Sequence, residues 1–337
     1  MKIKLGIIGY RNQAAKLLSI LENKPDVTIN TIFHPDKKID DSRFSNNFSD
    51  ILDSDAVIIA SPNHTHFNYI EQLLKEFSGY IFSEKPPVTS GEELAKLNSK
   101  SSNDKARIFF NFNLRFGELN KILEKNINSE SMGKTMNLQI IHTHGFAFKE
   151  KYPSSWRADG QKNLHNILDA ISIHYVDLLN LHFGQIKDSH YFPQLVSGKG
   201  TSFDSGYILL KYSNGVIASI TNSYAAPSIN EILMIGTNGF LTIRNNETTL
   251  FSPRDTFNSQ GNFTAPPVLK QNTFNFEEEI NNSQIKALEY FEKSKLLEDE
   301  FTGRNTNPSQ VFIKRCNHFS MNPPPDDWDG VWRMTTK

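Results

Sequence analysis

Residues 3–21 read IKLGIIGYRNQAAKLLSIL, a segment that divides into a strand, a tight turn and a helix. The run from Ile3 to Ile8 is mostly apolar and β-branched, as expected for a strand that is buried on both faces. Gly9 ends this run, and four apolar residues from Ala14 to Leu21 then recur at helical spacing. This order of elements predicts the beginning of a βαβ unit.

Four further strands are predicted in the first third of the chain, each as a short apolar run. They are Val27 to Phe33, Ala56 to Ala60, Tyr80 to Ser83 and Ile108 to Phe112. A helix is predicted over His66 to Phe77, where apolar side chains gather on one side. Strands that alternate with helices indicate a parallel sheet covered on both faces. We therefore predict an N-terminal α/β domain, residues 1–118, with a Rossmann-like, doubly wound parallel sheet.

The pattern changes after Arg115. One long helix is predicted over Asn163 to Phe183. Asn214-Gly215 and Asn238-Gly239 stand between apolar runs and indicate hairpin turns, because both residue types tolerate positive φ. The predicted strands are Met136 to Thr143, Ser205 to Tyr212, Val216 to Ser223, Glu231 to Ile235 and Phe240 to Arg244.

A helix and a polar tail are predicted at the end of the chain. Ile280 to Lys293 has apolar residues at helical spacing, and Pro323 to Asp327 is polar and rich in proline. We predict a C-terminal α+β domain, residues 119–322, built on one open, mostly antiparallel sheet, followed by a polar tail, residues 323–337.

The composition excludes several classes of protein. Lysine and arginine number 36 against 37 acidic residues, so the net charge of the 337 residues is −1. Since polyanions and anionic membranes are bound through clustered basic residues, we predict no nucleic-acid and no membrane partner. No apolar run approaches the roughly 18 residues of a membrane span. Arg11 and Lys16 interrupt the N-terminal apolar run, which predicts a cytoplasmic protein without a signal peptide. The single cysteine, Cys316, cannot form an internal disulfide.

The turn after the first strand has part of the composition of a dinucleotide-binding loop. Such loops use glycine for a tight turn, a second glycine for close approach to the pyrophosphate, and a small third residue for helix packing. Gly9 and Ala14 satisfy the first and third requirements, whereas Arg11 occupies the second position. Cofactor contacts are predicted for Gly9, Tyr10, Arg11 and Asn12; the alternative is a plain strand-to-helix turn.

The end of the second predicted strand bears on the choice of dinucleotide. An acidic residue at this position usually binds the ribose hydroxyls of NAD. This chain has His34 there, followed by Asp36 and Lys37. The lost acid and the basic neighbour are compatible with the extra phosphate of NADP, while Asp36 could serve NAD. His34 is a candidate cofactor contact, the alternative being a surface turn, and the sequence leaves NAD and NADP open.

Five motifs in a fixed order make the chain resemble a known family. They are Ser61-Pro62-Asn63 with His66, Ser83-Glu84-Lys85-Pro86, Asn113-Leu114-Arg115, His174-Tyr175-Val176-Asp177 and Gly236-Thr237-Asn238-Gly239-Phe240. Over most of its length the sequence resembles the Gfo/Idh/MocA family, named after glucose-fructose oxidoreductase, inositol dehydrogenase and rhizopine catabolism. The resemblance implies a two-domain fold. It also implies that NAD or NADP is used to oxidise or reduce a hydroxyl of a sugar, a cyclitol or a sugar nucleotide.

The resemblance implies roles for individual residues as well. Lys85 is expected to reach the reacting oxygen, where a lysine can stabilise a developing alkoxide or relay its proton. His174 is expected to do acid–base work on the substrate hydroxyl; the alternative is a hydrogen-bonded histidine on a mostly apolar helix. Further cofactor contacts are expected from Ser61, Pro62, Asn63, His66, Glu84 and Lys85, and substrate contacts from Asp177, Trp156, Arg157 and Arg115.

One position of the long helix departs from the family pattern. Ala170 stands where the family commonly has an aspartate, four residues before the histidine. On an α-helix with about 100° per residue, Ala170 lies about 40° and Asp177 about 60° from His174, so the three share a face. Asp169 lies about 140° from His174 on the same helix. The sequence therefore predicts that Asp169 does not replace the missing acid.

The leading hypothesis is an NAD(P)-dependent oxidoreductase that acts on a carbohydrate, such as a nucleotide-linked or carboxylated sugar of surface-polysaccharide biosynthesis. The departures at Arg11, His34 and Ala170 motivate a rival, a non-catalytic sensor or assembly partner. A third alternative is a lyase or epimerase that recycles its cofactor. A homodimer or homotetramer is predicted because the open sheet needs its outer face covered. No metal site is predicted, since His64-Thr65-His66 and His142-Thr143-His144 lack a third ligand.

Overall fold

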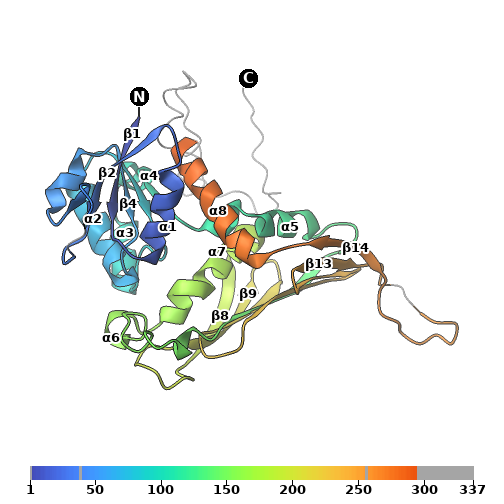
Figure 1. Cartoon of the computed structure of the whole chain (residues 1–337). Coiled ribbons are helices and arrows are strands. Elements are labelled where there is room, and N and C mark those ends of the chain that lie inside the picture. Colours follow the sequence, from blue (N-terminus) through green and yellow to red (C-terminus); the bar gives the residue numbers. More distant parts are fainter. Residues whose placement is uncertain (1, 38–39, 255–256, 294–337) are drawn as a thin grey trace, which may run out of the picture.

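The structure is a computed structural model that describes residues 2–37, 40–254 and 257–293. Two β-sheets dominate it: a parallel sheet in the N-terminal part and a larger sheet that extends away from it (Figure 1). None of the described helices is long and apolar enough to cross a membrane. The predicted polar tail, Cys316 and the end of the second predicted domain, residues 294–322, lie outside the described residues.

The first sheet has six strands in the order β3-β2-β1-β4-β5-β6, and every described pair is parallel. The strands are β1 (Ile3–Ile8), β2 (Val27–Phe33), β3 (Phe44–Ser45), β4 (Ala56–Ile59), β5 (Tyr80–Ser83) and β6 (Ile108–Phe110). The strand order reverses between β1 and β4, which is where sheets of this kind bind their ligands. The predicted doubly wound parallel sheet is confirmed. The edge strand β3 was missed because two residues give no periodic pattern.

Helices cover both faces of this sheet. They are α1 (Asn12–Leu21), α2 (His66–Glu76), α3 (Gly91–Asn98) and α4 (Ser102–Ala106), with short 3-10 helices at Phe48–Asp53, Asn63–Thr65 and Asn113–Phe116. The apolar residues of α1 pack on one face with Ile7 and Ile32, and those of α2 pack on the other face with Ile59 and Ile81. Because both faces are buried, the strands read as continuous apolar runs.

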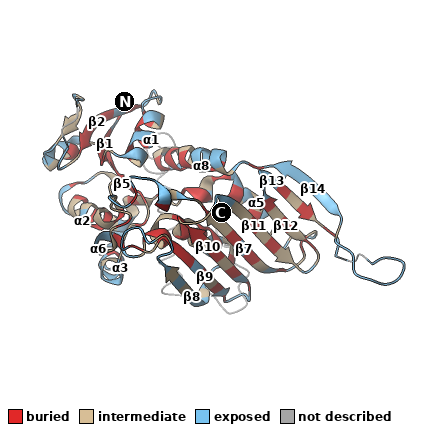
Figure 2. Cartoon of the chain, turned by 60° about the horizontal axis from the view of Figure 1, so that its bottom comes forward, coloured by how far each residue is buried: buried red, intermediate tan, exposed pale blue. Residues whose placement is uncertain are grey.

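The second sheet has eight strands in the order β14-β13-β12-β11-β7-β10-β9-β8. They are β7 (Thr135–Thr143), β8 (Ile186–Gln194), β9 (Ser205–Tyr212), β10 (Ile217–Ser223), β11 (Ile229–Gly236), β12 (Phe240–Arg244), β13 (Glu247–Phe251) and β14 (Val268–Thr273). Among the described pairs of this sheet only β7 and β10 run parallel, so the predicted open, mostly antiparallel sheet is confirmed. The sequence missed β8, β13 and β14: the edge strand β8 is polar and contains Pro193, and β14 is exposed along its whole length (Figure 2).

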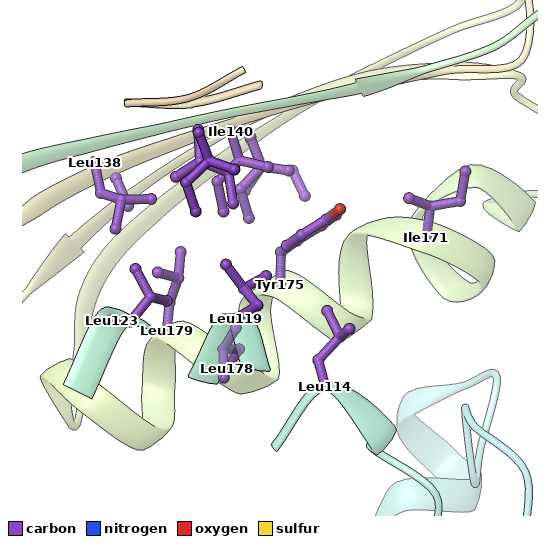
Figure 3. Close-up of a cluster of buried hydrophobic side chains, with 14 of the residues drawn as sticks. Leu114, Leu119, Leu123, Leu138, Ile140, Ile171, Tyr175, Leu178 and Leu179 are labelled. Atoms are coloured by element: carbon purple, nitrogen blue, oxygen red, sulfur yellow. The ribbon is translucent and has the colours of Figure 1, made fainter. Parts of the chain in front are cut away.

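One face of the second sheet is covered by α5 (Glu118–Asn126) and α7 (Ile173–Phe183). Leu119 of α5 and Leu179 of α7 point toward Ile140 on the central strand β7 (Figure 3). The opposite face is left uncovered by the described part of the chain (Figure 1).

The long helix predicted over Asn163 to Phe183 is not one α-helix. It consists of a short α6 (Gly160–Asn163), a π-helix (Leu168–Ser172) and α7. A π-helix closes its hydrogen bonds between residues five apart, so each residue turns the chain by less than in an α-helix. Angular positions that assume 3.6 residues per turn therefore do not hold across this segment.

The last described helix, α8 (Phe276–Phe291), connects the second sheet to the first (Figure 1). Its residues Leu288 and Phe291 are buried in the core that contains α1. Lys24 Nζ lies 2.6 Å from Glu292 Oε2 at the end of this contact. The predicted returning helix is present and begins one turn earlier than expected. It packs on the N-terminal sheet, although the sequence grouped its residues with the second domain.

Candidate active site

A cavity of about 330 Å³ lies where the loops after β4 and β5 face the π-helix and α7. Residues of the first sheet's loops, of the second sheet and of α8 all line it, so neither half of the chain forms it alone. Of the residues predicted from the sequence, the cavity brings together Ser61, Asn63, His66, Glu84, Lys85, Trp156, Arg157 and His174. The predicted residues Gly9, Tyr10, Arg11, Asn12, His34, Pro62, Arg115 and Asp177 lie outside its lining.

Lys85 follows β5 and reaches into this cavity. The Lys85–Pro86 peptide bond is cis, and Lys85 Nζ donates a hydrogen bond of 2.6 Å to the carbonyl oxygen of Ala170. Burial lowers the pKa of Lys85 to about 8, while the carboxylate of Glu84 acts in the opposite direction. A lysine with this pKa can both donate and accept a proton near neutral pH.

His66 joins the loop after β4 to the loop after β5. Its Nδ1 lies 2.7 Å from the carbonyl oxygen of Pro86, and its Nε2 lies 2.9 Å from the carbonyl oxygen of Ser61. The ring is buried, and burial lowers its pKa. Because the backbone occupies both ring nitrogens, His66 positions the loop that carries Lys85. Contact of His66 with a cofactor stays a prediction.

Glu84 is the centre of a buried polar network beside the cavity. Its Oε1 accepts hydrogen bonds from Gln13 Nε2 at 2.7 Å and from Asn111 Nδ2 at 2.8 Å. The same two groups donate to Oε1 of Gln284 on α8, Gln13 Nε2 at 3.2 Å and Asn111 Nδ2 at 3.0 Å. Burial raises the pKa of Glu84, and the charge of Lys85 lowers it. The three amides were missed from the sequence because they belong to no motif, yet they fix the backbone from which Lys85 extends.

His174 lies on the first turn of α7, and its side chain forms part of the cavity wall. Its Nδ1 is buried and has no hydrogen-bond partner among the residues that the structure describes. Burial holds the pKa of His174 well below its usual range, and the charge of Lys85 lowers it further. The imidazole is therefore neutral at neutral pH and can accept a proton.

Two histidines at the end of β7 line the same cavity and were not predicted as site residues: His142 within the strand and His144 directly after it. His142 Nδ1 lies 2.7 Å from the hydroxyl of Tyr175, and burial lowers the pKa of His142 to about 4. The ring of His144 stacks on Tyr224 with centroids 5.1 Å apart. The sequence treated these two residues only as an incomplete set of metal ligands. In residues 2–37, 40–254 and 257–293, no group of three His, Cys, Asp or Glu side chains could hold a metal ion.

The π-helix changes the position expected for Asp169. Asp169 lies within the π-helix, which ends at Ser172, whereas His174 lies in α7, which follows it. The separation of about 140° assumed for an α-helix therefore does not hold. Ala170 does line the cavity with His174. The charge of Asp169 acts on Lys85 and raises its pKa, against the larger effect of burial. An acidic side chain, that of Asp169, thus acts on Lys85. It stands one residue before Ala170, where the family commonly has an aspartate.

We expect Asp169→Asn to reduce the pH dependence of stability. Burial raises the pKa of Asp169 from 3.8 to about 7, against the opposing effects of Asn163 and Lys85. The folded chain thus holds a proton that the unfolded chain releases, so this contribution to stability is complete below about pH 4 and is lost as the pH rises to about 7. Urea unfolding at about pH 5 and about pH 7.5 measures the loss.

The control for this experiment is Asp159→Asn, which removes a carboxylate that pairs with Lys162 at 2.6 Å outside the cavity. Its difference in unfolding free energy between the two pH values should equal that of the unmodified protein. If the unfolding free energy of Asp169→Asn also changed between the two pH values by as much as that of the unmodified protein, a raised pKa for Asp169 would be contradicted.

Arg115 and Asp177, both predicted as substrate contacts, bind each other. Arg115 Nε donates to Asp177 Oδ2 at 2.7 Å, and Arg115 Nη2 donates to Oδ1 at 2.5 Å. This pair raises the pKa of Arg115. It ties the end of the first domain to α7, outside the cavity lining. Contact of either residue with a substrate stays a prediction.

The turn after β1 fits a dinucleotide. Gly9 has a φ of +105°, and a Cβ there would lie 2.7 Å from the carbonyl oxygen of Ala60, so only glycine allows β1 and β4 to approach this closely. Arg11, the residue before α1, makes no side-chain cap, which leaves the N-terminus of the helix open to an anion.

Buried Nδ2 of Asn63 and Nε2 of Gln284 have no partner among the described residues, and both residues line the cavity. These donors suit a polar ligand next to Lys85.

His34 is engaged by its own turn. Its Nδ1 accepts hydrogen bonds from the backbone N–H groups of Asp36 and Lys37, both at 3.2 Å. Lys37 Nζ lies 3.4 Å from the carbonyl oxygen of Tyr10. Burial lowers the pKa of His34, and the charge of Lys37 lowers it further, while Asp36 raises it. Basic and acidic groups both lie at the end of β2, so the geometry is compatible with NAD and with NADP.

Fold and site together define a two-domain, dinucleotide-binding protein of the Rossmann class, in which a second sheet completes the cavity beside Lys85. The chain belongs to the Gfo/Idh/MocA family of oxidoreductases. Residues 3–112 match the family model for the NAD-binding Rossmann fold of this oxidoreductase family, and residues 121–242 match the model for its C-terminal domain. The resemblance inferred from the five motifs is confirmed.

Several known proteins are similar to this chain. An inositol 2-dehydrogenase from Rhizobium meliloti is 27% identical over 179 residues, which are 52% of this chain and 52% of the relative. The chain thus matches about half the length of this curated relative. An oxidoreductase from Agrobacterium radiobacter, solved in complex with NAD+, L-tartaric acid and magnesium, has a TM-score of 0.70 at 16% identity, with 96% of this chain and 98% of that chain covered. A myo-inositol dehydrogenase from Corynebacterium glutamicum has a TM-score of 0.66 at 16% identity, with coverage of 95% and 96%. At these identities the solved structures establish the fold.

Proposed function

We propose that this protein is an NAD(P)-dependent dehydrogenase or reductase that transfers hydride to or from a carbon of a sugar or nucleotide sugar. The observation that carries the proposal is that Lys85 and His174 face one cavity at the carboxyl ends of the parallel strands. The similarity to an inositol 2-dehydrogenase supports it. We extend the proposal to a cytoplasmic protein of surface-polysaccharide biosynthesis, where nucleotide sugars are common substrates.

The two side chains have complementary proton affinities for this reaction. When bound, the nicotinamide accepts or supplies the hydride. In the oxidative direction the hydroxyl proton passes to Lys85 or to the neutral imidazole of His174, and the C–O bond becomes a carbonyl. In the reductive direction the same group returns the proton to the oxygen. Lys85 suits both directions because its pKa is about 8.

Calorimetric titration with NADH and with NADPH tests the proposal, followed by assays of nicotinamide absorbance with a panel of sugars and nucleotide sugars. We expect binding of at least one dinucleotide and turnover of at least one sugar. No binding of either dinucleotide at millimolar concentration would contradict the proposal and favour the non-catalytic alternative. Dinucleotide retained through purification, with substrate conversion but no net change in absorbance, would indicate a lyase or an epimerase.

We further propose that the uncovered face of the second sheet is the interface of a homodimer or homotetramer. Tyr207, Ile217 and Ile229 on this face are 41%, 40% and 37% exposed, and Phe240 stacks on Phe251 with centroids 4.4 Å apart. Exposed apolar side chains on an open sheet face favour coverage of that face by another copy of the chain. Light scattering after size exclusion should give the mass of an oligomer, and Ile217→Lys should shift the mass toward the monomer. A monomeric unmodified protein would contradict the proposal.

A further inference from the structure

Arg157 is a cation in the cavity wall, and none of the described residues forms an ion pair with it. Its guanidinium carbon lies 4.5 Å from the centroid of the Trp156 ring and 5.9 Å from that of Phe146, which belongs to the 3-10 helix Phe146–Phe148. Within the described part of the chain, no carboxylate or other acceptor is bonded to this guanidinium. Aromatic faces hold a guanidinium by cation–π contact and leave its N–H edge available.

Three carboxylates in this part of the structure are engaged elsewhere. Glu84 accepts hydrogen bonds from the side-chain amides of Gln13 and Asn111. Glu279 accepts the first backbone N–H groups of α5, at 2.8 and 3.1 Å. Asp159 pairs with Lys162 at 2.6 Å. None of these carboxylates neutralises Arg157.

The charge of Arg157 reaches the candidate reacting centre. Burial lowers the pKa of Lys85, Glu84 raises it, and Arg157 lowers it further, while Asp169 raises it. Burial also lowers the pKa of His142, to about 4, so this ring adds no charge at neutral pH. Arg157 is therefore a positive charge near Lys85 that forms no ion pair with the described residues, while the carboxylate of Asp169 acts on Lys85 itself.

We propose that the cavity binds a sugar that carries a carboxylate, and that the Arg157 guanidinium binds this carboxylate. The planar guanidinium matches a carboxylate with two parallel hydrogen bonds, which a lysine cannot make. The partly buried setting strengthens the attraction relative to water. Trp156 lines the same cavity next to Arg157 and offers an apolar ring to the sugar. This inference rests on the proposed function, because it names the class of sugar that the same site would take.

Direct binding measurements test the inference without depending on turnover. Calorimetry in the presence of NADH would use D-glucuronate and D-galacturonate, their neutral counterparts D-glucose and D-galactose, and D-glucose 6-phosphate. The unmodified protein should bind at least one uronate about tenfold or more tighter than its neutral counterpart. Arg157→Gln should raise the Kd of that uronate about 100-fold and leave the Kd of the neutral sugar unchanged. Arg157→Lys, which keeps the charge but not the planar shape, should recover part of the loss.

The matched control is Lys149→Gln. Lys149 Nζ also lies near the Phe146 ring, 5.8 Å from its centroid, but Lys149 does not line the cavity. This variant should leave every Kd unchanged, which separates a local contact from a general loss of positive charge.

Three results would overturn the inference: equal affinity for uronates and neutral sugars, an unchanged uronate Kd in Arg157→Gln, or tighter binding of glucose 6-phosphate than of either uronate. Its failure is distinguishable from failure of the proposed function. Uronate binding that depends on Arg157, without any dinucleotide-dependent turnover, would support the carboxylate site and contradict the dehydrogenase. Dinucleotide-dependent turnover of neutral sugars alone would support the dehydrogenase and contradict the carboxylate site.

Discussion

Replacing Lys85 by methionine should lower kcat about 10²- to 10⁴-fold, the usual contribution of a general acid or base. Methionine keeps the length and the apolar stem of lysine but removes the ammonium group, which donates to the carbonyl oxygen of Ala170 at 2.6 Å. Steady-state assays of the unmodified protein and the variant, with the sugar that the panel identifies, measure the change. The variant should retain its fold, because the network around Glu84 does not include the lysine side chain.

An acid–base role of Lys85 also predicts the direction in which kcat/KM changes with pH. Burial lowers the pKa of Lys85 to about 8. In the oxidative direction kcat/KM should rise as the pH passes through about 8, since the neutral amine accepts the proton. In the reductive direction kcat/KM should fall over the same range, because the protonated form is then required.

Lys96→Met is the control for this prediction, since Lys96 forms a surface ion pair with Glu92 at 2.7 Å. It should leave kcat and both pH profiles unchanged. A kcat in Lys85→Met within a few-fold of the unmodified value would show that Lys85 is not the catalytic acid or base. If circular dichroism shows that Lys85→Met does not fold, the pH profile of kcat/KM is measured for Lys85→Arg instead.

Truncation of Phe291 to alanine should lower the free energy of unfolding by about 3–5 kcal/mol. Phe291 is 2% exposed, and its ring centroid lies 5.3 Å from Phe82 and 5.6 Å from Phe109. The loss combines the removed apolar contacts with the cavity that remains in a packed core. Urea unfolding, followed by fluorescence, measures the change in midpoint at constant slope.

The neighbouring residue provides the control. Tyr290 is 46% exposed, and its main ring contact is with Phe116 at 5.0 Å. Tyr290→Ala should therefore cost about 1 kcal/mol. Equal losses in the two variants would contradict the burial of Phe291 in the first sheet's core and thus the docking of α8 on that sheet.

The sequence predicted those parts of the site that follow directly from a strand or a helix. Lys85 lies two residues after β5 and His174 lies at the start of α7, so their elements could be identified from local apolar patterns. The two residues themselves were singled out by the resemblance to the family. Gln13, Asn111 and Gln284 could not be identified in this way. They converge on Glu84 from separate elements, and an amide carries no signal of burial in the sequence.

The α-helical geometry assumed for Asp169 does not hold, for a related reason, although Asp169 does not line the cavity with His174. Local spacing predicts that residues 163–183 are helical but does not distinguish a π-helix at Leu168–Ser172 from an α-helix. π-helices are rare and are frequent at functional sites, and the carbonyl oxygen of Ala170 in this one accepts the hydrogen bond of Lys85.

By itself the sequence determined the doubly wound sheet, the antiparallel sheet and the positions of Lys85 and His174, because each depends on neighbouring residues and on backbone preferences that act over a few positions. The tertiary structure alone decided which side chains meet. Arg115 binds Asp177 across 62 residues of chain, α8 returns to the first sheet, and Arg157 is left with its charge facing the cavity. These contacts form only when separate elements pack together, and complementary shape and charge across the whole molecule select them, which no local pattern encodes.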